Sequence, residues 1–150
     1  MQIIKDKQLV ASQWSYISDD DALVEGDITV SLNRWCKEKP LLKKHSGKVG
    51  VRVDSDVDIL RLAEDVDTFA LIELNFSAFT DGRGFSHARI LRKDLNYQGE
   101  IRAVGRYMAD QAFYLSRVGV NAFQMENEED LVVALSTLND FSIKYQASTD

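Results

Sequence analysis

The feature that most constrains this fold is a regular alternation of apolar, strand-like segments with helical segments after Lys48. The strand-like segments are 48–54, 68–76, 99–105 and 121–125, and the helical segments are 55–66, 86–95, 107–118 and 128–141. Helices of about this length between strands are typical of right-handed crossovers in a parallel sheet. The sequence therefore predicts an α/β domain with a parallel sheet of about four strand–helix units.

The residues before this alternation predict a different arrangement. Two short strand-like segments in "QIIKDKQLVASQWSYI" are expected to form a β-hairpin, and "SLNRWCKEK" is expected to form a helix. At 150 residues the chain is most simply a single domain. We therefore expect a hairpin and helix in residues 1–47, repeated units in 48–142 and a tail in 143–150.

A polar residue lies near the centre of each predicted strand of the repeat, opposite the apolar positions of that strand. These residues are Arg52, Glu73, Arg102 and Gln124. Two architectures remain open: a half-TIM-barrel-like sheet whose concave face carries the polar row, and an open doubly wound sheet with charges near the strand ends. The row also has a purely structural interpretation, as a buried ion-pair network that sets the register.

The segment "FTDGRGFSHARILR" joins the second of these strands to its helix. Parallel α/β proteins bind ligands at this carboxyl end of the sheet, and a helix N-terminus beside an arginine suits an anion. The predicted ligand-binding residues of this loop are Asp81, Gly82, Arg83, Gly84 and Ser86, and Ser86 is also expected to cap the following helix. The alternative is a glycine turn in which Asp81 bonds its own backbone.

Other residues complete the set of candidates. Arg102, Asp110 and Gln111 are predicted to bind a ligand, since the last two open the helix after the third strand. Glu73 and His87 are the candidate catalytic residues, each as a general acid or base. The spacing of histidine, cysteine and carboxylate residues resembles no metal site. The sequence has no dinucleotide fingerprint and no redox cysteine pair, so whether the protein binds a cofactor stays unknown.

The net charge and the cysteine count limit which partners and which cellular compartment are expected for this protein. A net charge of −6 disfavours a non-specific nucleic-acid binder and an anionic membrane surface. The single cysteine suits a reducing cytosol, and no signal-peptide pattern or apolar run of about 18 residues occurs. We expect a cytoplasmic protein without a membrane span. The polar sheet face or the acidic segment "DDDALVEGD" is available to a partner, including a second subunit of a homodimer.

The run from Phe76 to Gln124 resembles a bacterial family of unknown function whose members are often described as oxidoreductases of sulfite reduction. The resemblance rests on the pattern F-x-D-G-R-G-x-S-x-A-x-x-L-R, then G-x-x-R-A-x-G, D-Q and R-x-G-x-x-x-F. The matching residues are Phe79, Asp81, Gly82, Arg83, Gly84, Ser86, Ala88, Leu91, Arg92, Gly99, Arg102, Ala103, Gly105, Asp110, Gln111, Arg117, Gly119 and Phe123.

The resemblance implies a role beside assimilatory sulfite reduction, but it assigns no catalytic residue. Our first hypothesis is an accessory protein that binds a small oxyanion or docks on a sulfite reductase subunit, with Arg83, Arg102 and Asp110 shaping its site. The alternatives are a small α/β enzyme acting on an anionic substrate, with Glu73 or His87 as its base, and a pure protein-interaction module. Whether the protein is an enzyme stays open at this point.

Overall fold

The computed structural model describes residues 1–78 and 82–149, and describes side chains as far as Asp140. The strands are β1 (Gln2–Lys5), β2 (Gln8–Ala11), β3 (Ser15–Tyr16), β4 (Ile28–Ser31), β5 (Val49–Asp54), β6 (Leu71–Phe76), β7 (Glu100–Gly105) and β8 (Ala122–Phe123). The α-helices are α1 (Leu32–Lys43), α2 (Arg83–Lys93), α3 (Ala112–Arg117) and α4 (Glu128–Thr149), and the 3-10 helices are η1 (Ile59–Leu62), η2 (Val66–Thr68) and η3 (Ala109–Gln111).

All the strands belong to one sheet of the order β2-β1-β8-β7-β6-β5-β4-β3. From β3 to β8 the strands are parallel, and each lies beside the next one in the chain. Right-handed crossovers that always step in the same direction put their connections on the same face of a sheet. The half-barrel prediction is therefore confirmed. The doubly wound alternative is wrong, because it requires the strand order to reverse at a switch point.

The N-terminal hairpin adds two antiparallel strands to this parallel set. β1 pairs with β2, as the sequence predicts, and its other edge pairs antiparallel with β8. The hairpin turn is formed by Asp6 and Lys7, which both have positive φ (50° and 65°). Two such residues make a turn whose twist matches that of the strands. The sheet is therefore mixed, and the prediction of a purely parallel sheet is wrong.

A short connection forces the sheet to curl. β2 and β3 lie at opposite ends of the strand order, yet only Ser12, Gln13 and Trp14 separate them. Seven spacings between the strands of a flat sheet amount to about 34 Å. The four peptide steps from Ala11 to Ser15 reach at most about 14 Å. The two ends of the sheet must therefore approach each other, and the curled sheet has an inner and an outer face.

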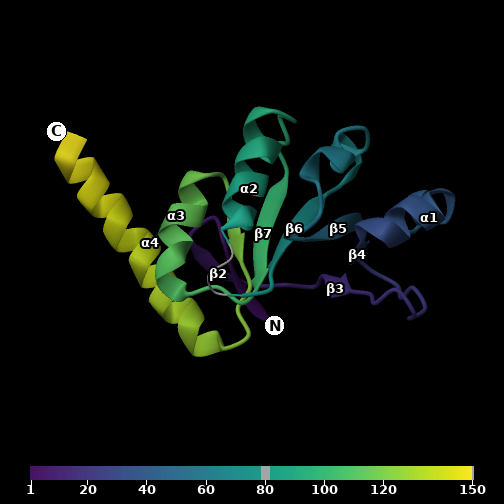
Figure 1. Ribbon diagram of the computed structural model, residues 1–150. Coiled ribbons are helices and arrows are strands. Elements are labelled where there is room, and N and C mark those ends of the chain that lie inside the picture. Colours follow the sequence, from purple (N-terminus) through teal and green to yellow (C-terminus); the bar gives the residue numbers. More distant parts are fainter. Residues whose placement is uncertain (79–81, 150) are drawn as a thin grey trace.

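The outer face carries the main hydrophobic core, which packs against the helices (Figure 1). The strands contribute the alternate apolar residues Ile28, Val30, Val51, Val53, Ile72, Leu74, Ile101, Ala103 and Phe123, and the helices contribute Leu32, Trp35, Ala88, Leu91, Leu131, Ala134 and Leu138. The inner face has a smaller set of buried apolar side chains, which are Ile3, Leu71, Val104 and Ala122. These apolar side chains share the inner face with Arg52, Glu73 and Arg102. Because side chains alternate between the faces along a strand, the outer face carries the apolar core and the inner face carries a mixture of apolar and charged groups.

Several helices differ from the sequence predictions. The segment 55–66, predicted as one helix, contains η1 and the start of η2, so the prediction of four regular strand–helix units is wrong in this unit. The Asp58 carboxylate accepts from the Leu60 N–H at 3.0 Å, and such local bonds compete with an α-helix. The segment 107–118 divides into η3 and α3. α4 continues to Thr149 and so includes most of the expected tail.

Replacing Gly50 with alanine tests the close approach of β5 and β6. A Cβ atom at this position would overlap the main-chain oxygen of Leu71, which cannot rotate away. We expect Gly50→Ala to lower the free energy of unfolding by about 1 to 3 kcal/mol, measured by urea denaturation. Gly82→Ala is the control, because a Cβ there meets nothing within 4 Å. Equal stability of wild type and Gly50→Ala would show that the strands are farther apart.

Candidate functional site

The carboxyl ends of β5 and β6 meet the start of α2 and bring polar side chains together. We call Asp54, Ser55, Asn75, Arg83 and His87 the carboxyl-end cluster. Asp54 and Asn75 are register partners on adjacent strands, and the Asn75 amide donates to the Asp54 carboxylate at 2.8 Å. This is the end of a parallel sheet at which α/β proteins bind ligands.

Gly84 sets the position of α2. Gly84 is buried against the ring of Phe76, and a Cβ at this position would overlap that ring. The helix begins at Arg83. Its N-cap is Gly82, which has no side chain to accept a hydrogen bond from the first N–H groups of the helix. Arg83 then reaches across to β5, where its guanidinium donates to the Ser55 hydroxyl at 3.3 Å. Gly84 therefore acts by close packing against Phe76, which brings Arg83 to the strand ends.

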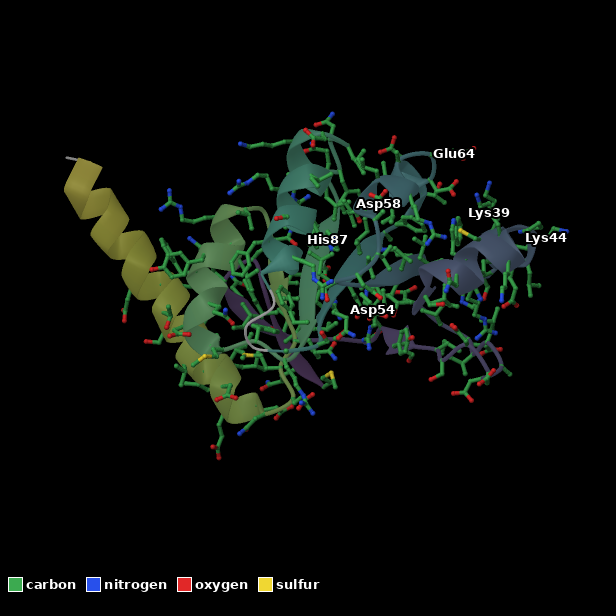
Figure 2. The ribbon with its side chains drawn as sticks, viewed as in Figure 1. Lys39, Lys44, Asp54, Asp58, Glu64 and His87 are labelled. Atoms are coloured by element: carbon green, nitrogen blue, oxygen red, sulfur yellow. The ribbon has the colours of Figure 1, made fainter. Side chains whose placement is uncertain are left out.

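His87 lies one turn after Arg83 and is 8% exposed. Figure 2 shows it on α2 above the end of β5 that carries Asp54. His87 and Arg83 each form further polar or ring interactions within the protein. Ser86 is exposed and does not cap the helix, so that prediction is wrong, since α2 starts three residues earlier. Asp81 lies outside the described residues.

The predicted polar row is present on the inner face. Arg52, Glu73 and Arg102 are partners in the register of β5, β6 and β7. The Arg52 guanidinium donates to the Glu73 carboxylate at 3.0 Å, and its carbon lies 4.0 Å from the centre of the Tyr16 ring. β8 contributes Ala122 to this row, and Gln124 lies beyond the end of that strand. Glu73 is 2% exposed, and its charge is matched by an arginine.

Arg102 is held by a second ion-pair group. It is 2% exposed, and its Nε and Nη2 donate to the Glu100 carboxylate at 3.0 and 2.7 Å. Nη1 donates to the Ser12 hydroxyl at 3.0 Å, and Lys5 lies 3.2 Å from the other oxygen of Glu100. Each guanidinium nitrogen therefore donates inside the protein. This geometry favours a structural role, and we leave Arg102 out of the proposed binding site.

Two tyrosines beside these charges remain protonated at neutral pH. Burial raises the pKa of Tyr107 well above its usual value, and the charge of Arg102 only partly opposes this effect. The Tyr107 hydroxyl donates to the main-chain oxygen of Gln124 at 2.8 Å. Burial likewise raises the pKa of Tyr16, against the lowering effect of Arg52. Both hydroxyls can therefore act as hydrogen-bond donors over the physiological pH range.

The remaining predicted site residues are not brought into one group. Gln111 caps η3, because its side-chain oxygen accepts from the Met108 N–H at 2.8 Å. Asp110 is exposed beside it. Gln111 lines a pocket with residues of α2 and α3, whereas Arg102 lines a different pocket with β1 and residues 10–14. Glu73 points away from the sheet face that α2 covers, while His87 is carried by α2.

Three members of the carboxyl-end cluster were not predicted as site residues. Asp54 is the last residue of β5, and Ser55 follows it. Asn75 lies one residue before the end of β6. Their position directly at the ends of two adjacent predicted strands is the signal that identifies them.

The cluster supplies chemistry suited to binding. Arg83 brings a positive charge, Ser55 a hydroxyl, and His87 an imidazole, next to the first N–H groups of α2. These groups are hydrogen-bond donors to an anion. Among the described residues, no group of three or more histidine, cysteine or acidic side chains is placed to hold a metal ion. In the same part of the chain, no helix is both long and apolar enough to cross a membrane.

Residues 50–150 match the family described as "Bacterial protein of unknown function (DUF934)". This chain belongs to the DUF934 family. The match includes the carboxyl-end cluster, the inner-face charges Arg52, Glu73 and Arg102, and every helix after β5. The hairpin and α1 precede the matched region of this DUF934 protein. No curated protein matches the chain.

The Arg102–Glu100 pair gives a stability prediction. Arg102→Met leaves the Glu100 carboxylate, which is 10% exposed, with Lys5 as its one ionic partner among the described residues, so we expect unfolding to require about 3 kcal/mol less free energy. Adding Glu100→Gln should restore part of that loss, because the remaining group is then neutral. A double-mutant cycle by urea denaturation measures the coupling. Additive effects of the two substitutions would contradict the proposed pairing.

Proposed function

We propose that this DUF934 protein is an accessory protein of assimilatory sulfite reduction that binds a small oxyanion at the carboxyl-end cluster. The observation that carries the proposal is the placement of Arg83 at the N-terminus of α2, within 3.3 Å of Ser55 at the end of the adjacent strand β5. The proposal concerns binding, and it assigns no catalytic step.

The physical basis is the convergence of donors from two elements. Helix N-termini carry unpaired N–H groups and a partial positive charge, and arginine forms paired hydrogen bonds with oxyanions. α2 has eleven residues, and its start lies close to Phe76 because Gly84 has no side chain to separate them. Asp54 lies in the same cluster, but its carboxylate accepts a hydrogen bond from Asn75. An anion beside Arg83 thus meets donors from α2 and from Ser55.

The link to sulfite reduction is supported by the resemblance of residues 76–124 to proteins described in that role. The same motif residues Gly82, Arg83 and Gly84 form the start of α2. Sulfite and sulfate are compact oxyanions of the kind that such donors hold.

Ligand binding gives the first test. Sulfite, sulfate or phosphate at about 100 times its Kd should stabilise the wild type by about 2.7 kcal/mol, which corresponds to a rise in Tm of about 5 to 10 °C. Arg83→Ala should remove that rise, because Arg83 is the only arginine or lysine of the carboxyl-end cluster. Differential scanning calorimetry with and without each anion measures the effect.

Lys44→Ala is the matched control for lost positive charge, since Lys44 lies at the far tip of α1 (Figure 2). It should leave the ligand-induced rise unchanged. Each variant is compared with itself, so a change in its basal stability does not affect the result. A rise that persists in Arg83→Ala would place the anion elsewhere, and no rise with any of the three anions would refute oxyanion binding.

Growth tests the cellular role separately. A bacterium that lacks the gene for this protein should grow more slowly with sulfate than with cysteine as its sulfur source. Expression of the wild type should restore growth on sulfate, and expression of Arg83→Ala should not. Equal growth of the deletion strain on both sources would contradict a role in sulfite reduction, whatever the outcome of the binding experiment.

A further inference from the structure

A basic groove lies between α2 and α3, away from the carboxyl-end cluster. It consists of two adjoining pockets of about 730 and about 280 Å³, which share Arg89, Arg117 and Val118. The remaining lining residues are Phe85, Arg92, Lys93, Gln111, Tyr114, Ser116 and Gly119. None of these lining residues is acidic, although the chain as a whole carries a net charge of −6.

The cations of the groove differ in how they are held. Arg92 donates four hydrogen bonds to the main-chain oxygens of Tyr97, Gly99 and Gly119, at 2.7 to 3.0 Å. These acceptors are uncharged, so Arg92 adds a fixed positive charge to the groove wall. Arg89 and Lys93 are exposed on α2, and Arg117 is exposed at the end of α3. The groove therefore concentrates positive charge on a surface that is negative overall.

The groove also has apolar walls. Phe85 and Val118 are partly buried in it, and the side chain of Tyr114 is 55% exposed. Arginines and lysines that only contact water do not require apolar neighbours of this kind. A surface with arginines and an aromatic residue is typical of protein-recognition sites, at which a charged segment with an apolar residue docks.

The same chain carries a segment of complementary chemistry. The acidic loop, residues 19–27 between β3 and β4, has the sequence "DDDALVEGD" with five acidic residues and a Val24 that is 47% exposed. Asp19 bonds the Ser31 hydroxyl and Asp27 bonds the Lys48 N–H. These two bonds anchor both ends of the loop, and Asp20, Asp21 and Glu25 are exposed between them.

The two surfaces cannot meet within one molecule. Figure 1 shows the segment between β3 and β4 on the side of α1, away from α2 and α3, the helices that line the groove. We infer that the basic groove of one copy receives the acidic loop of a second copy. The charges attract, and Val24 supplies an apolar group for the part of the groove next to Phe85 and Val118. The occupant of the groove is therefore another molecule of this protein.

This contact is head-to-tail, because the groove and the loop are different surfaces. Such a contact forms either a closed ring or an open chain, and an open chain keeps one free groove and one free loop at its ends. The attraction between exposed charges is screened by salt. The inference uses no residue of the carboxyl-end cluster, so it does not depend on oxyanion binding.

Sedimentation equilibrium of the full chain tests the self-association. At protein concentrations up to about 500 µM in about 50 mM salt, the mean mass should rise above the monomer mass of 17.0 kDa. In about 500 mM salt it should return toward the monomer value. A monomer at every concentration in low salt would overturn the inference. Binding of an acidic peptide by that monomer would point to a foreign partner and would likewise overturn it.

Charge reversal identifies the two surfaces. Arg89→Glu with Arg117→Glu should give a monomer, and so should Asp20→Lys with Asp21→Lys. An equimolar mixture of these two double variants pairs an intact groove with an intact loop and a reversed groove with a reversed loop, so it should assemble although neither variant does so alone. The fourfold variant restores opposite charges on the two surfaces and should assemble again. A mixture that stays monomeric would refute the pairing of groove and loop.

Glu64→Lys with Asp67→Lys is the control for reversed acidic charge. Both residues are exposed around η2, outside the acidic loop. This variant should assemble like the wild type, and its loss of assembly would show that net charge, not the acidic loop, drives association. Circular dichroism and thermal melting of every variant confirm that each is folded.

Discussion

Three residues, Ser12 to Trp14, connect strands from opposite ends of an eight-stranded sheet, and this connection forces the sheet to curl. The other features of the structure depend on that closure. It creates an inner face that the helices do not cover, and it brings the Ser12 hydroxyl to the guanidinium of Arg102. A flat sheet of the same strands would leave Glu73 and Arg102 in water, whereas the curled sheet buries both.

Burial of these charges requires that each be paired. Glu73 is matched by Arg52 and Arg102 by Glu100, so the inner face is a structural interior that contains ions as well as Leu71 and Val104. Breaking one of these pairs is expected to cost more than the pair itself contributes, because the remaining charge cannot regain water. The paired charges of the inner face therefore suit a structural role, and the oxyanion site that we propose lies at the end of the sheet instead.

The surface divides into regions with separate roles in our proposals. The carboxyl-end cluster collects donors from β5 and α2 at the ligand end of the sheet, and the basic groove lies on the helical side between α2 and α3. Both regions are within residues 50–150, which match the DUF934 family, whereas the acidic loop precedes them. Oxyanion binding is thus proposed for a site inside residues 50–150. The proposed self-association joins the basic groove in that region of one copy to the acidic loop in the N-terminal part of another copy.

The sequence by itself determined the alternation of strands and helices, the period of two that places Arg52, Glu73 and Arg102 on one face, and the position of the glycine loop at a strand end. These are local properties, which follow from side-chain direction and turn chemistry. Only the tertiary structure decided that Arg102 donates to Ser12, ninety residues away, and that Arg52 pairs with Glu73 on the adjacent strand. The strand order and the closure of the sheet set those contacts, and neither is encoded in the spacing of residues along one strand.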